Sequence, residues 1–348
     1  MKLPNWRSIG IHIGIGAVAL ACVLPAAAQE QTKIKFTLDW KIQGVHAWYY
    51  WAHDKGYFKA ENLDVTIDQG EGSAAAVSRV MSGTYQAGVG DMNAIIQGAA
   101  TRPGDAPVMV YMVYSRAPFA LITKAGSSIK SIKDVEGKNL GSPAGGAAFR
   151  VFAALAKKNG IDDKKVTWTN MAPNLQEQML LRGQVDAAAV FSATSYMNLV
   201  ALGVDPDKDI NWMFYNDSGL DLYSNGVLVS AKLLREKPKA VAGLVRAVNR
   251  ALKECVANPD PCIENLVKNE PLINKDIEKR RLAYVLKSSI LTPEAAEIGL
   301  GDVKDARMSR AIAQIVDSYE LGRTPTPAEV FDRSFLPPKA DRMVKSAL

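Results

Sequence analysis

The sequence predicts an α/β protein of two lobes, each a mixed, mostly parallel sheet flanked by helices, with a ligand cleft between the lobes. Three observations carry this prediction. Short apolar runs with strand spacing alternate with helical runs up to residue 118, and the same order starts again after it. Such alternation is typical of mostly parallel sheets covered by helices. From residue 231 onward the pattern is almost wholly helical, which predicts helices that return to cover the first lobe.

The first 28 residues have the layout of a secretory signal peptide. Lys2 and Arg7 precede an uncharged apolar run over residues 9–24, and a proline and three alanines follow. The run is shorter than the roughly 20 residues that span a membrane as a helix. Cleavage after Ala28 is therefore favoured over a membrane anchor, and acylation of Cys22 is a third interpretation. We expect an exported, periplasmic protein.

The first lobe is expected to begin at residue 33. Apolar residues alternate at Ile34, Phe36 and Leu38, which is the spacing of a strand. A helical stretch over residues 44–53 and an alternating strand over residues 63–67 complete a β-α-β unit. The unit then repeats, because "EGSAAAVSRVMSG" and "NAIIQGAA" are typical of helices, and "YQAGVGD" and "VMVYMVY" are typical of strands.

The second lobe repeats this order over residues 119–221. After "APFALITK" the order restarts with "SIKDVEGKNLGS", which leads to a strand. Further strands are expected in "VTWTN", "VDAAAV" and "NWMFY", and helices in "AAFRVFAALAKKNG", "NLQEQMLLRG" and "SATSYMNLVALG". The chain then returns, so residues 33–118 and 222–348 together make the first lobe. The returning part is expected to hold helices over residues 231–258, 261–268, 275–288 and 308–321.

Charge and cysteine content exclude several classes of protein. Removing Lys2 and Arg7 with the signal peptide changes the formal charge from +6 to +4, and no basic block interleaved with aromatic residues argues for a nucleic-acid partner. The remaining cysteines, Cys255 and Cys262, flank a turn with two prolines, "CVANPDPC". An even pair in an exported protein predicts a local disulfide. Neither a metal site nor a cofactor is expected, and we expect a monomer.

Candidate ligand-binding residues follow from the rule that ligands of open α/β sheets bind beyond the carboxyl ends of the strands, near helix N-termini. In the first lobe the candidates are Asp39, Trp40, His46, Ser73, Asp91, Met92, Asn93 and Tyr114. In the second lobe they are Ser142, Gly145, Gly146, Asn174, Gln176 and Phe191, and on the return crossing Asp221, Tyr223 and Asn225. These positions face one cleft if the two lobes oppose each other.

Each role has an alternative. Trp40 is expected to stack on a planar ring, with packing as the alternative. Asp39, Asp91 or Asn93 are expected to accept hydrogen bonds from ring amines, and His46 to donate one. The Gly145 and Gly146 amides are expected to donate to a ligand oxygen, which also suits a sulfonate or carboxylate. Ser73 equally fits a plain helix cap, and Tyr114, Phe191 and Tyr223 would line the walls. Trp48, Tyr49 and Trp51 lie within one helix and are expected to be core and flank packing.

No nucleophile or metalloprotease motif is present, so the sequence gives little support to catalysis. Four stretches instead carry a family resemblance: residues 33–67, which include the strand end "LDW", a nearby histidine and "KGYF", and residues 80–91, 180–191 and 225–252. Through them the chain resembles thiamine-pyrimidine-synthase-like periplasmic binding proteins, relatives of those that serve sulfonate, taurine, nitrate and riboflavin-type transporters.

The resemblance implies a type II periplasmic-binding-protein fold and, as partners, a small molecule and an ABC permease with its ATPase at the inner membrane. The implied ligand is a heteroaromatic compound such as a thiamine pyrimidine precursor; an organic sulfonate, taurine, nitrate or carboxylate is the alternative. Enzymes of this branch carry a lysine and a histidine that here align with Gly90 and Ala94, and a cysteine-rich motif that is missing. We therefore expect no enzyme. A sensor that presents its ligand to a membrane receptor is a third interpretation.

Overall fold

The computed structural model describes residues 1–4 and 30–344. The signal peptide predicted over residues 1–28, with its alternative at Cys22, lies mostly outside these described residues. By its internal contacts the chain divides into Met1–Glu30 and Gln31–Leu348, and the second unit holds all the strands and helices named below. In the described part of the chain no helix is both long and apolar enough to cross a membrane.

The first sheet has five strands. They lie in the order β2 (Leu63–Asp68), β1 (Thr32–Thr37), β3 (Ala87–Asp91), β10 (Asn225–Val229) and β4 (Val108–Met112). β2 and β3 run parallel to β1, and β10 is antiparallel to both β3 and β4. β10 is thus the strand that returns from the second sheet and lies between strands of the N-terminal part.

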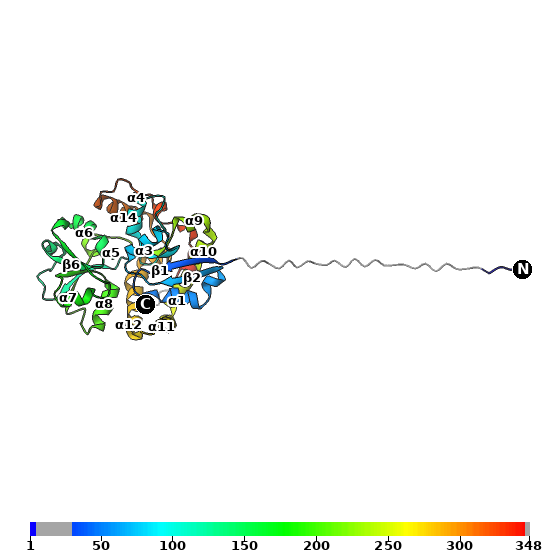
Figure 1. Cartoon of the computed structure of the whole chain (residues 1–348), viewed down its shortest axis with the longest axis horizontal. Helices are drawn as coiled ribbons and strands as arrows, with labels where there is room; N and C mark the ends of the chain where they lie inside the picture. The colour runs from blue at the N-terminus through cyan, green and yellow to red at the C-terminus, as the bar shows by residue number, and fades with distance from the viewer. Residues whose placement is uncertain (5–29, 345–348) are drawn as a thin grey trace. The chain divides into compact units, whose positions relative to one another are not determined.

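The second sheet has the same plan. Its order is β7 (Thr167–Asn170), β6 (Asn139–Ser142), β8 (Ala187–Phe191), β5 (Phe119–Lys124) and β9 (Ile210–Phe214). Here β5, the strand that arrives from the first sheet, is antiparallel to both of its neighbours. The chain crosses between the sheets twice, over residues 113–118 and 215–224. Figure 1 shows the green elements of the second sheet beside the blue and cyan elements of the first.

Helices follow most strands and cover the sheets. Around the first sheet they are α1 (Ala47–Asp54), α2 (Tyr57–Ala60), α3 (Ser73–Met81) and α4 (Met92–Thr101). Around the second sheet they are α5 (Ala147–Arg150), α6 (Phe152–Asn159), α7 (Gln176–Leu181) and α8 (Ser192–Ala201). The C-terminal part adds α9 (Ala231–Glu236), α10 (Pro238–Ala257), α11 (Pro259–Asn269), α12 (Lys275–Val285), α13 (Pro293–Ile298), α14 (Asp305–Ser318), α15 (Pro327–Val330) and α16 (Lys339–Arg342).

The C-terminal helices cover the first sheet, as predicted, but they also reach the second. α10 and α11 pack on α1, whereas α12 packs on α8, and α14 packs on both α4 and α6. Figure 1 shows α11 and α12 beside α1, and α14 beside α4. The helical part therefore connects the two lobes in addition to covering one of them.

Several helices differ from the prediction, and the single helix expected over residues 147–160 is divided into α5 and α6. The single helix expected over residues 231–258 is two helices, because Pro238 lacks the N–H that would continue α9 and instead occupies the first turn of α10. α12 continues into a π-helical segment, Leu286–Ile290, and α13 was not predicted at all. Its six residues are too few to give a periodic pattern.

The aromatic run at the start of the chain is mostly core. Trp48 and Tyr49 are each 1% exposed and belong to the cluster that fills the space between the first sheet and α10 and α11. Trp51 lies at the flank, where its indole N–H donates to Glu254 at 2.7 Å. A disulfide joins Cys255 at the end of α10 to Cys262 in α11. Burial of large side chains contributes about 1.5–3 kcal/mol each, which makes this cluster a main source of stability in the first lobe.

Candidate functional site

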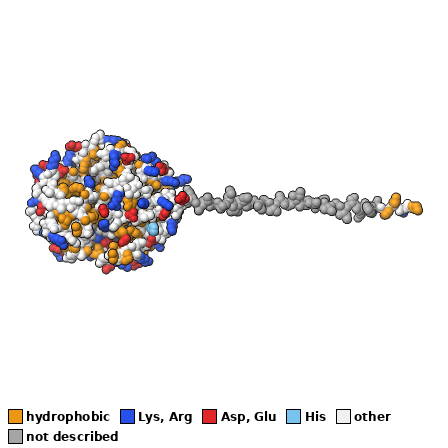
Figure 2. Space-filling model, in the orientation of Figure 1, with side chains coloured by type: hydrophobic (Ala, Val, Ile, Leu, Met, Phe, Trp, Pro, Cys, Tyr) orange, Lys and Arg blue, Asp and Glu red, His pale blue; other side chains and the backbone are white. Residues whose placement is uncertain are grey.

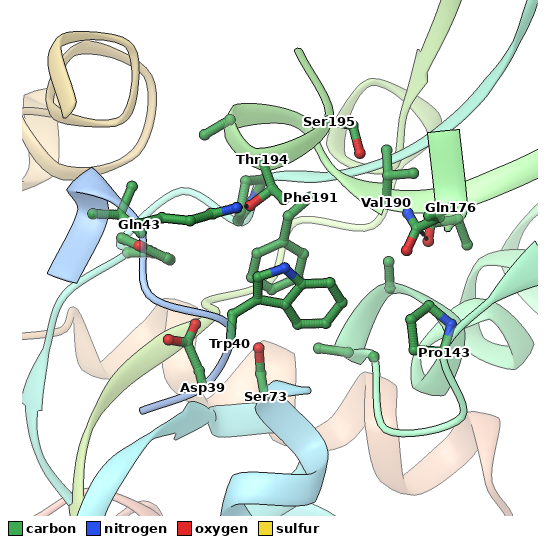
Figure 3. Close-up of a pocket in the computed structure, with 18 of the residues that line it drawn as sticks. Asp39, Trp40, Gln43, Ser73, Pro143, Gln176, Val190, Phe191, Thr194 and Ser195 are labelled. Carbon is green, nitrogen blue, oxygen red and sulfur yellow. Dashed lines mark hydrogen bonds between the residues drawn. The ribbon is translucent and has the colours of Figure 1, made fainter. Parts of the chain in front are cut away.

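A pocket lies between the two sheets, lined by residues from both. Of the residues expected at the cleft, it brings together Asp39, Trp40, His46, Ser73, Tyr114, Ser142, Gly146, Gln176 and Phe191. The other lining residues are Gln43, Val45, Pro118, Pro143, Ala147, Ala148, Ala189, Val190, Ala193, Thr194, Ser195 and Val285. Figure 3 shows the indole of Trp40 in the middle of this group, with Asp39 and Ser73 on one side and Gln176 and Val190 on the other.

The walls of the pocket lie close together. The cavity measures about 30 Å³, which is room for one or two water molecules. The lobes also touch directly. The Gly145 carbonyl of the second lobe accepts hydrogen bonds from the Ala74 and Ala75 N–H groups of α3, at 3.1 and 3.4 Å. The structure is therefore a closed conformation, and a ring-sized ligand enters only if side chains or lobes move.

The first-lobe wall is organised around Asp39, which follows β1. His46 Nδ1 accepts the backbone N–H of Gln43 at 3.1 Å, so the ring hydrogen lies on Nε2. Nε2 then donates to Asp39 Oδ1 at 2.8 Å. The side-chain amide of Asn225 donates to Asp39 Oδ2 at 2.5 Å and to Ser73 Oγ at 2.9 Å. These bonds hold one carboxylate in a fixed orientation at the pocket, although Asn225 itself lies behind the wall.

The second-lobe wall is tied to its own sheet. The Ser142 hydroxyl and the Gln176 amide N–H both donate to the Ala189 carbonyl, at 3.1 and 3.2 Å. The side-chain oxygen of Gln176 remains available as an acceptor. Ser195 donates to the buried Glu177, whose pKa is raised by burial. The donors of this wall are thus mostly used within the protein.

The pocket is lined mainly by uncharged side chains. Among the described residues that line it, none is a lysine or an arginine. Burial holds the pKa of Tyr114 well above its usual value, so its hydroxyl stays neutral. The remaining positive character comes from the N-termini of α3 and α8, which begin at Ser73 and Ser192 beside the pocket. Figure 2 shows acidic and basic side chains interspersed over the visible face of the molecule.

Asp91, Met92 and Asn93 do not reach the pocket. Asp91 is fully buried and caps α4, because its Oδ1 accepts the N–H groups of Asn93 and Ala94 at 3.0 and 3.1 Å. The Asn93 side chain donates to the Tyr223 carbonyl, and Met92 packs in the core. The strand-end rule fails here because the return crossing covers the end of β3, where Met92 N–H donates to a carbonyl of that crossing.

The buried Asp91 predicts a pH dependence of stability. Burial raises its pKa from 3.8 to about 7. Between these values the folded protein holds a proton that the unfolded chain releases, so this group's contribution to the free energy of unfolding falls as pH rises from about 4 to 7, by up to about 1.4 kcal/mol per pH unit. We expect Asp91→Asn to remove this slope in urea unfolding at pH 5, 6, 7 and 8. If the free energy of unfolding depends on pH in Asp91→Asn as it does in wild type, Asp91 is not the group that holds this proton.

Asp221 and Tyr223 lie at the crossings instead of in the pocket. Arg307 of α14 donates to the Asp221 carboxylate at 2.6 Å, and its guanidinium lies 4.1 Å from the centre of the Tyr223 ring. Arg307 also donates to the Ser115 carbonyl of the first crossing at 2.7 Å and to the Leu222 carbonyl of the second at 3.2 Å. One side chain therefore joins both segments about which the lobes would move.

The amides of Gly145 and Gly146 were expected to donate to a ligand oxygen. Gly145 does not line the pocket, and its carbonyl accepts hydrogen bonds from α3. Gly146 lines the pocket, but its N–H donates to the Pro143 carbonyl at 2.9 Å. Three polar lining residues, Gln43, Thr194 and Ser195, were missed. Thr194 and Ser195 lie in the first turn of α8, shortly after the candidate Phe191. The rule that ligands bind near helix N-termini could therefore have found them. Gln43 had no local signal, because its role depends on Thr194 of the other lobe.

Two five-stranded sheets joined by two crossings, with a pocket between them, are the architecture of periplasmic solute-binding proteins. The alkanesulfonate-binding protein SsuA of Xanthomonas axonopodis pv. citri, bound to MOPS, superposes with a TM-score of 0.66 at 15% identity, covering 88% of this chain and 100% of that one. The aliphatic sulphonate-binding protein SsuA of Escherichia coli gives a TM-score of 0.60 at 13% identity, covering 90% and 92%. These likenesses establish the predicted fold.

The chain belongs to the NMT1/THI5-like family, whose model matches residues 43–261. This confirms the family predicted from the sequence. Riboflavin-binding protein RibY of Chloroflexus aurantiacus is 27% identical over 253 residues, 71% of this chain and 69% of that protein. A formylaminopyrimidine-binding protein of Halalkalibacterium halodurans is 24% identical over 295 residues, 82% and 86%. A 4-amino-5-hydroxymethyl-2-methylpyrimidine phosphate synthase of Candida albicans is 24% identical over 258 residues, 72% and 75%.

Proposed function

We propose that this protein is the exported solute-binding component of an ABC transporter and that it captures a small heteroaromatic ligand between its two lobes. The pocket carries this proposal, because both lobes contribute to its walls. A ligand that contacts both walls favours the closed conformation by its higher affinity for that state. A permease with its ATPase then recognises the closed shape. A sensor that presents the same closed shape to a receptor would use the same pocket.

The chemistry of the walls supports a neutral or amine-bearing ring. Asp39 is held by His46 and Asn225 and offers its carboxylate as an acceptor, and Gln176 offers a side-chain oxygen. Phe191 and Trp40 supply flat aromatic faces. Aromatic faces with a few fixed polar groups are typical of sites for small planar ligands. An anion would meet the Asp39 carboxylate with no lysine or arginine among the described lining residues to offset it.

An organic sulfonate or carboxylate is the second candidate. The observation in its favour is that α3 and α8 both begin at the pocket, since helix N-termini attract anions. In the closed conformation, however, the Ala74 and Ala75 N–H groups of α3 are already bonded to the Gly145 carbonyl. The N-terminus of α3 is thus used to join the lobes, which weakens this candidate.

A pyrimidine-synthase activity is less well supported. The position that aligns with the enzyme's lysine is Gly90, where an added Cβ would lie 2.7 Å from the Leu228 side chain and 2.8 Å from that of Val77. A lysine side chain does not fit there without rearranging the core. The described residues also contain no group of three His, Cys, Asp or Glu side chains suited to a metal ion. These observations favour binding over catalysis.

Thermal-shift screening followed by calorimetry tests the proposal. The panel is aminopyrimidines, riboflavin, taurine, alkanesulfonates, nitrate and aromatic carboxylates. A binding protein is stabilised by its ligand through linkage alone, so we expect an amine-bearing heterocycle to raise the melting temperature without being consumed. Binding of sulfonates or carboxylates alone would support the second candidate, and turnover of a heterocycle would overturn the binding-protein proposal.

Replacing Asp39 with asparagine is expected to weaken binding of that heterocycle about tenfold to hundredfold. A hydrogen bond to a charged group is worth about 1.5–3 kcal/mol, and the substituted side-chain amide has one neutral acceptor oxygen in place of a carboxylate. Calorimetric titration measures the loss. Asp64→Asn is the matched control, because Asp64 is exposed on β2 and away from the pocket. Equal affinities of the two variants would show that Asp39 does not contact the ligand.

A further inference from the structure

Trp40 separates two cavities. On one side is the enclosed pocket of about 30 Å³. On the other side is a groove of about 270 Å³ that opens to solvent. Trp40 and Gln43 line both. The rest of the groove comes from Lys41, Pro173, Asn174, Glu177, Gln178, Asn198, Ala201 and Leu202. The pocket and the groove are therefore neighbours with one shared wall.

Few hydrogen bonds hold the side chains of the shared wall. It consists of the Trp40 indole and the side-chain amide of Gln43, which accepts one hydrogen bond from the Thr194 hydroxyl at 3.2 Å. Within residues 30–344 the Trp40 indole N–H has no hydrogen-bond partner. The backbone beneath it is fixed, because the Trp40 and Asp39 carbonyls accept N–H bonds from Gly70 and Gly72, both at 2.9 Å. A turn of the indole about its side-chain bonds therefore breaks no hydrogen bond and needs no change of the main chain.

We propose that Trp40 is a gate that determines which ligands fit the site. In this closed conformation the indole lies in the middle of the lining side chains, as Figure 3 shows, and we infer that a ligand ring takes the same space. When it turns aside, the pocket and the groove join into one elongated site. That site takes a planar ring in the pocket with a polar chain in the groove, where the side-chain amides of Asn174, Gln178 and Asn198 lie. This inference rests on the proposed function, since it concerns the same pocket.

Indole and tryptophol, which is indole with a hydroxyethyl chain, test the gate in Trp40→Ala. Removing the side chain from a packed site leaves a cavity that binds a molecule of matching shape. We expect indole to bind Trp40→Ala at least tenfold more tightly than it binds wild type, measured by calorimetry and by the rise in melting temperature. We expect tryptophol to bind that variant at least as tightly as indole, because its chain extends into the groove.

A second substitution tests whether the chain occupies the groove. Leu202 is 43% exposed in the groove wall, so Leu202→Trp is expected to fill the groove with little effect on folding. Added to Trp40→Ala, it is expected to weaken tryptophol binding at least fivefold and to leave indole binding unchanged. Trp212→Ala, which removes a half-buried tryptophan elsewhere in the second lobe, is expected to bind neither compound.

Two results would overturn the gate: no indole binding by a folded Trp40→Ala variant, or equal binding by wild type. Exclusion of tryptophol from a variant that binds indole would refute the joining of pocket and groove. Circular dichroism and the melting temperature establish whether each variant is folded. Because the probes are indole compounds, the outcome does not depend on the natural ligand. If no compound of the ligand panel binds, the result counts against the transporter proposal and leaves the gate proposal standing. If indole fails to bind Trp40→Ala, the result counts against the gate and leaves the transporter proposal standing.

Discussion

Replacing Arg281 with alanine is expected to lower the free energy of unfolding by about 3–5 kcal/mol, the usual cost of leaving one partner of a buried ion pair alone. The Arg281 side chain is 2% exposed and pairs with Glu278, whose side chain is 7% exposed. It also donates to the Ala193 and Thr194 carbonyls, at 3.0 and 2.7 Å, and to Asn198 at 3.1 Å. All of these groups would lose a partner at once. Urea unfolding measures the loss.

Arg246→Ala is the matched control. Arg246 also pairs with a glutamate, Glu61, but the two side chains are 51% and 26% exposed. Exposed pairs contribute about 0–1 kcal/mol, so this variant is expected to unfold almost like wild type. If Arg281→Ala lowers the free energy of unfolding as little as Arg246→Ala does, the contacts of Arg281 do not form a stabilising buried network. Adding Glu278→Gln to Arg281→Ala is expected to recover part of the stability, since it removes the unpaired charge.

The Glu278–Arg281 pair also connects the two walls of the pocket. Glu278 accepts the backbone N–H of Gly44, which adjoins the pocket residue Gln43 of the first lobe. Arg281 holds the first turn of α8 in the second lobe through the carbonyls of Ala193 and Thr194. α12 is therefore a common support for both walls. We infer that lobe opening leaves the α12–α8 contact intact, since separating it would expose these buried charges.

Gly145→Ala is expected to weaken ligand binding about tenfold to hundredfold by opposing closure. A Cβ at Gly145 would lie 2.8 Å from the Ala75 Cβ of the first lobe, closer than real Cβ contacts. Overpacking of this kind costs about 1–3 kcal/mol, and each 1.4 kcal/mol is about tenfold in affinity. The clash exists only while the lobes touch. Calorimetry with the ligand found in the panel measures the affinity, and small-angle scattering measures the closed fraction.

Two further variants separate closure from local damage. Ala75→Gly, added to Gly145→Ala, removes the opposing Cβ and is expected to restore much of the affinity. Gly126→Ala adds a methyl group where no atom lies within 4 Å, and it is expected to bind like wild type. If the double variant binds no better than Gly145→Ala, the loss does not come from the contact between the lobes.

The strands and the fold class were predictable because they follow from local spacing. Alternating apolar residues in β1 place one face in the core whatever lies further along the chain. The strand-end rule found Asp39 and Trp40 at the pocket for the same reason, since a strand's direction fixes which end is its carboxyl end. It failed at Asp91, where a segment about 130 residues later in the chain covers the strand end. A local sequence pattern does not predict that a distant segment will cover a strand end.

By itself the sequence determined the alternation of strands and helices, the fold class and the family, and it pointed to Asp39 and Trp40. Only the tertiary structure decided which candidates share a wall. Gln43 meets Thr194 across 151 positions, and Arg281 meets Ala193 across 88. It also decided that Trp40 lies between the pocket and the groove and that Gly145 joins the lobes. These facts depend on contacts between segments far apart in the chain, whereas periodicity reports only which face of each segment is buried.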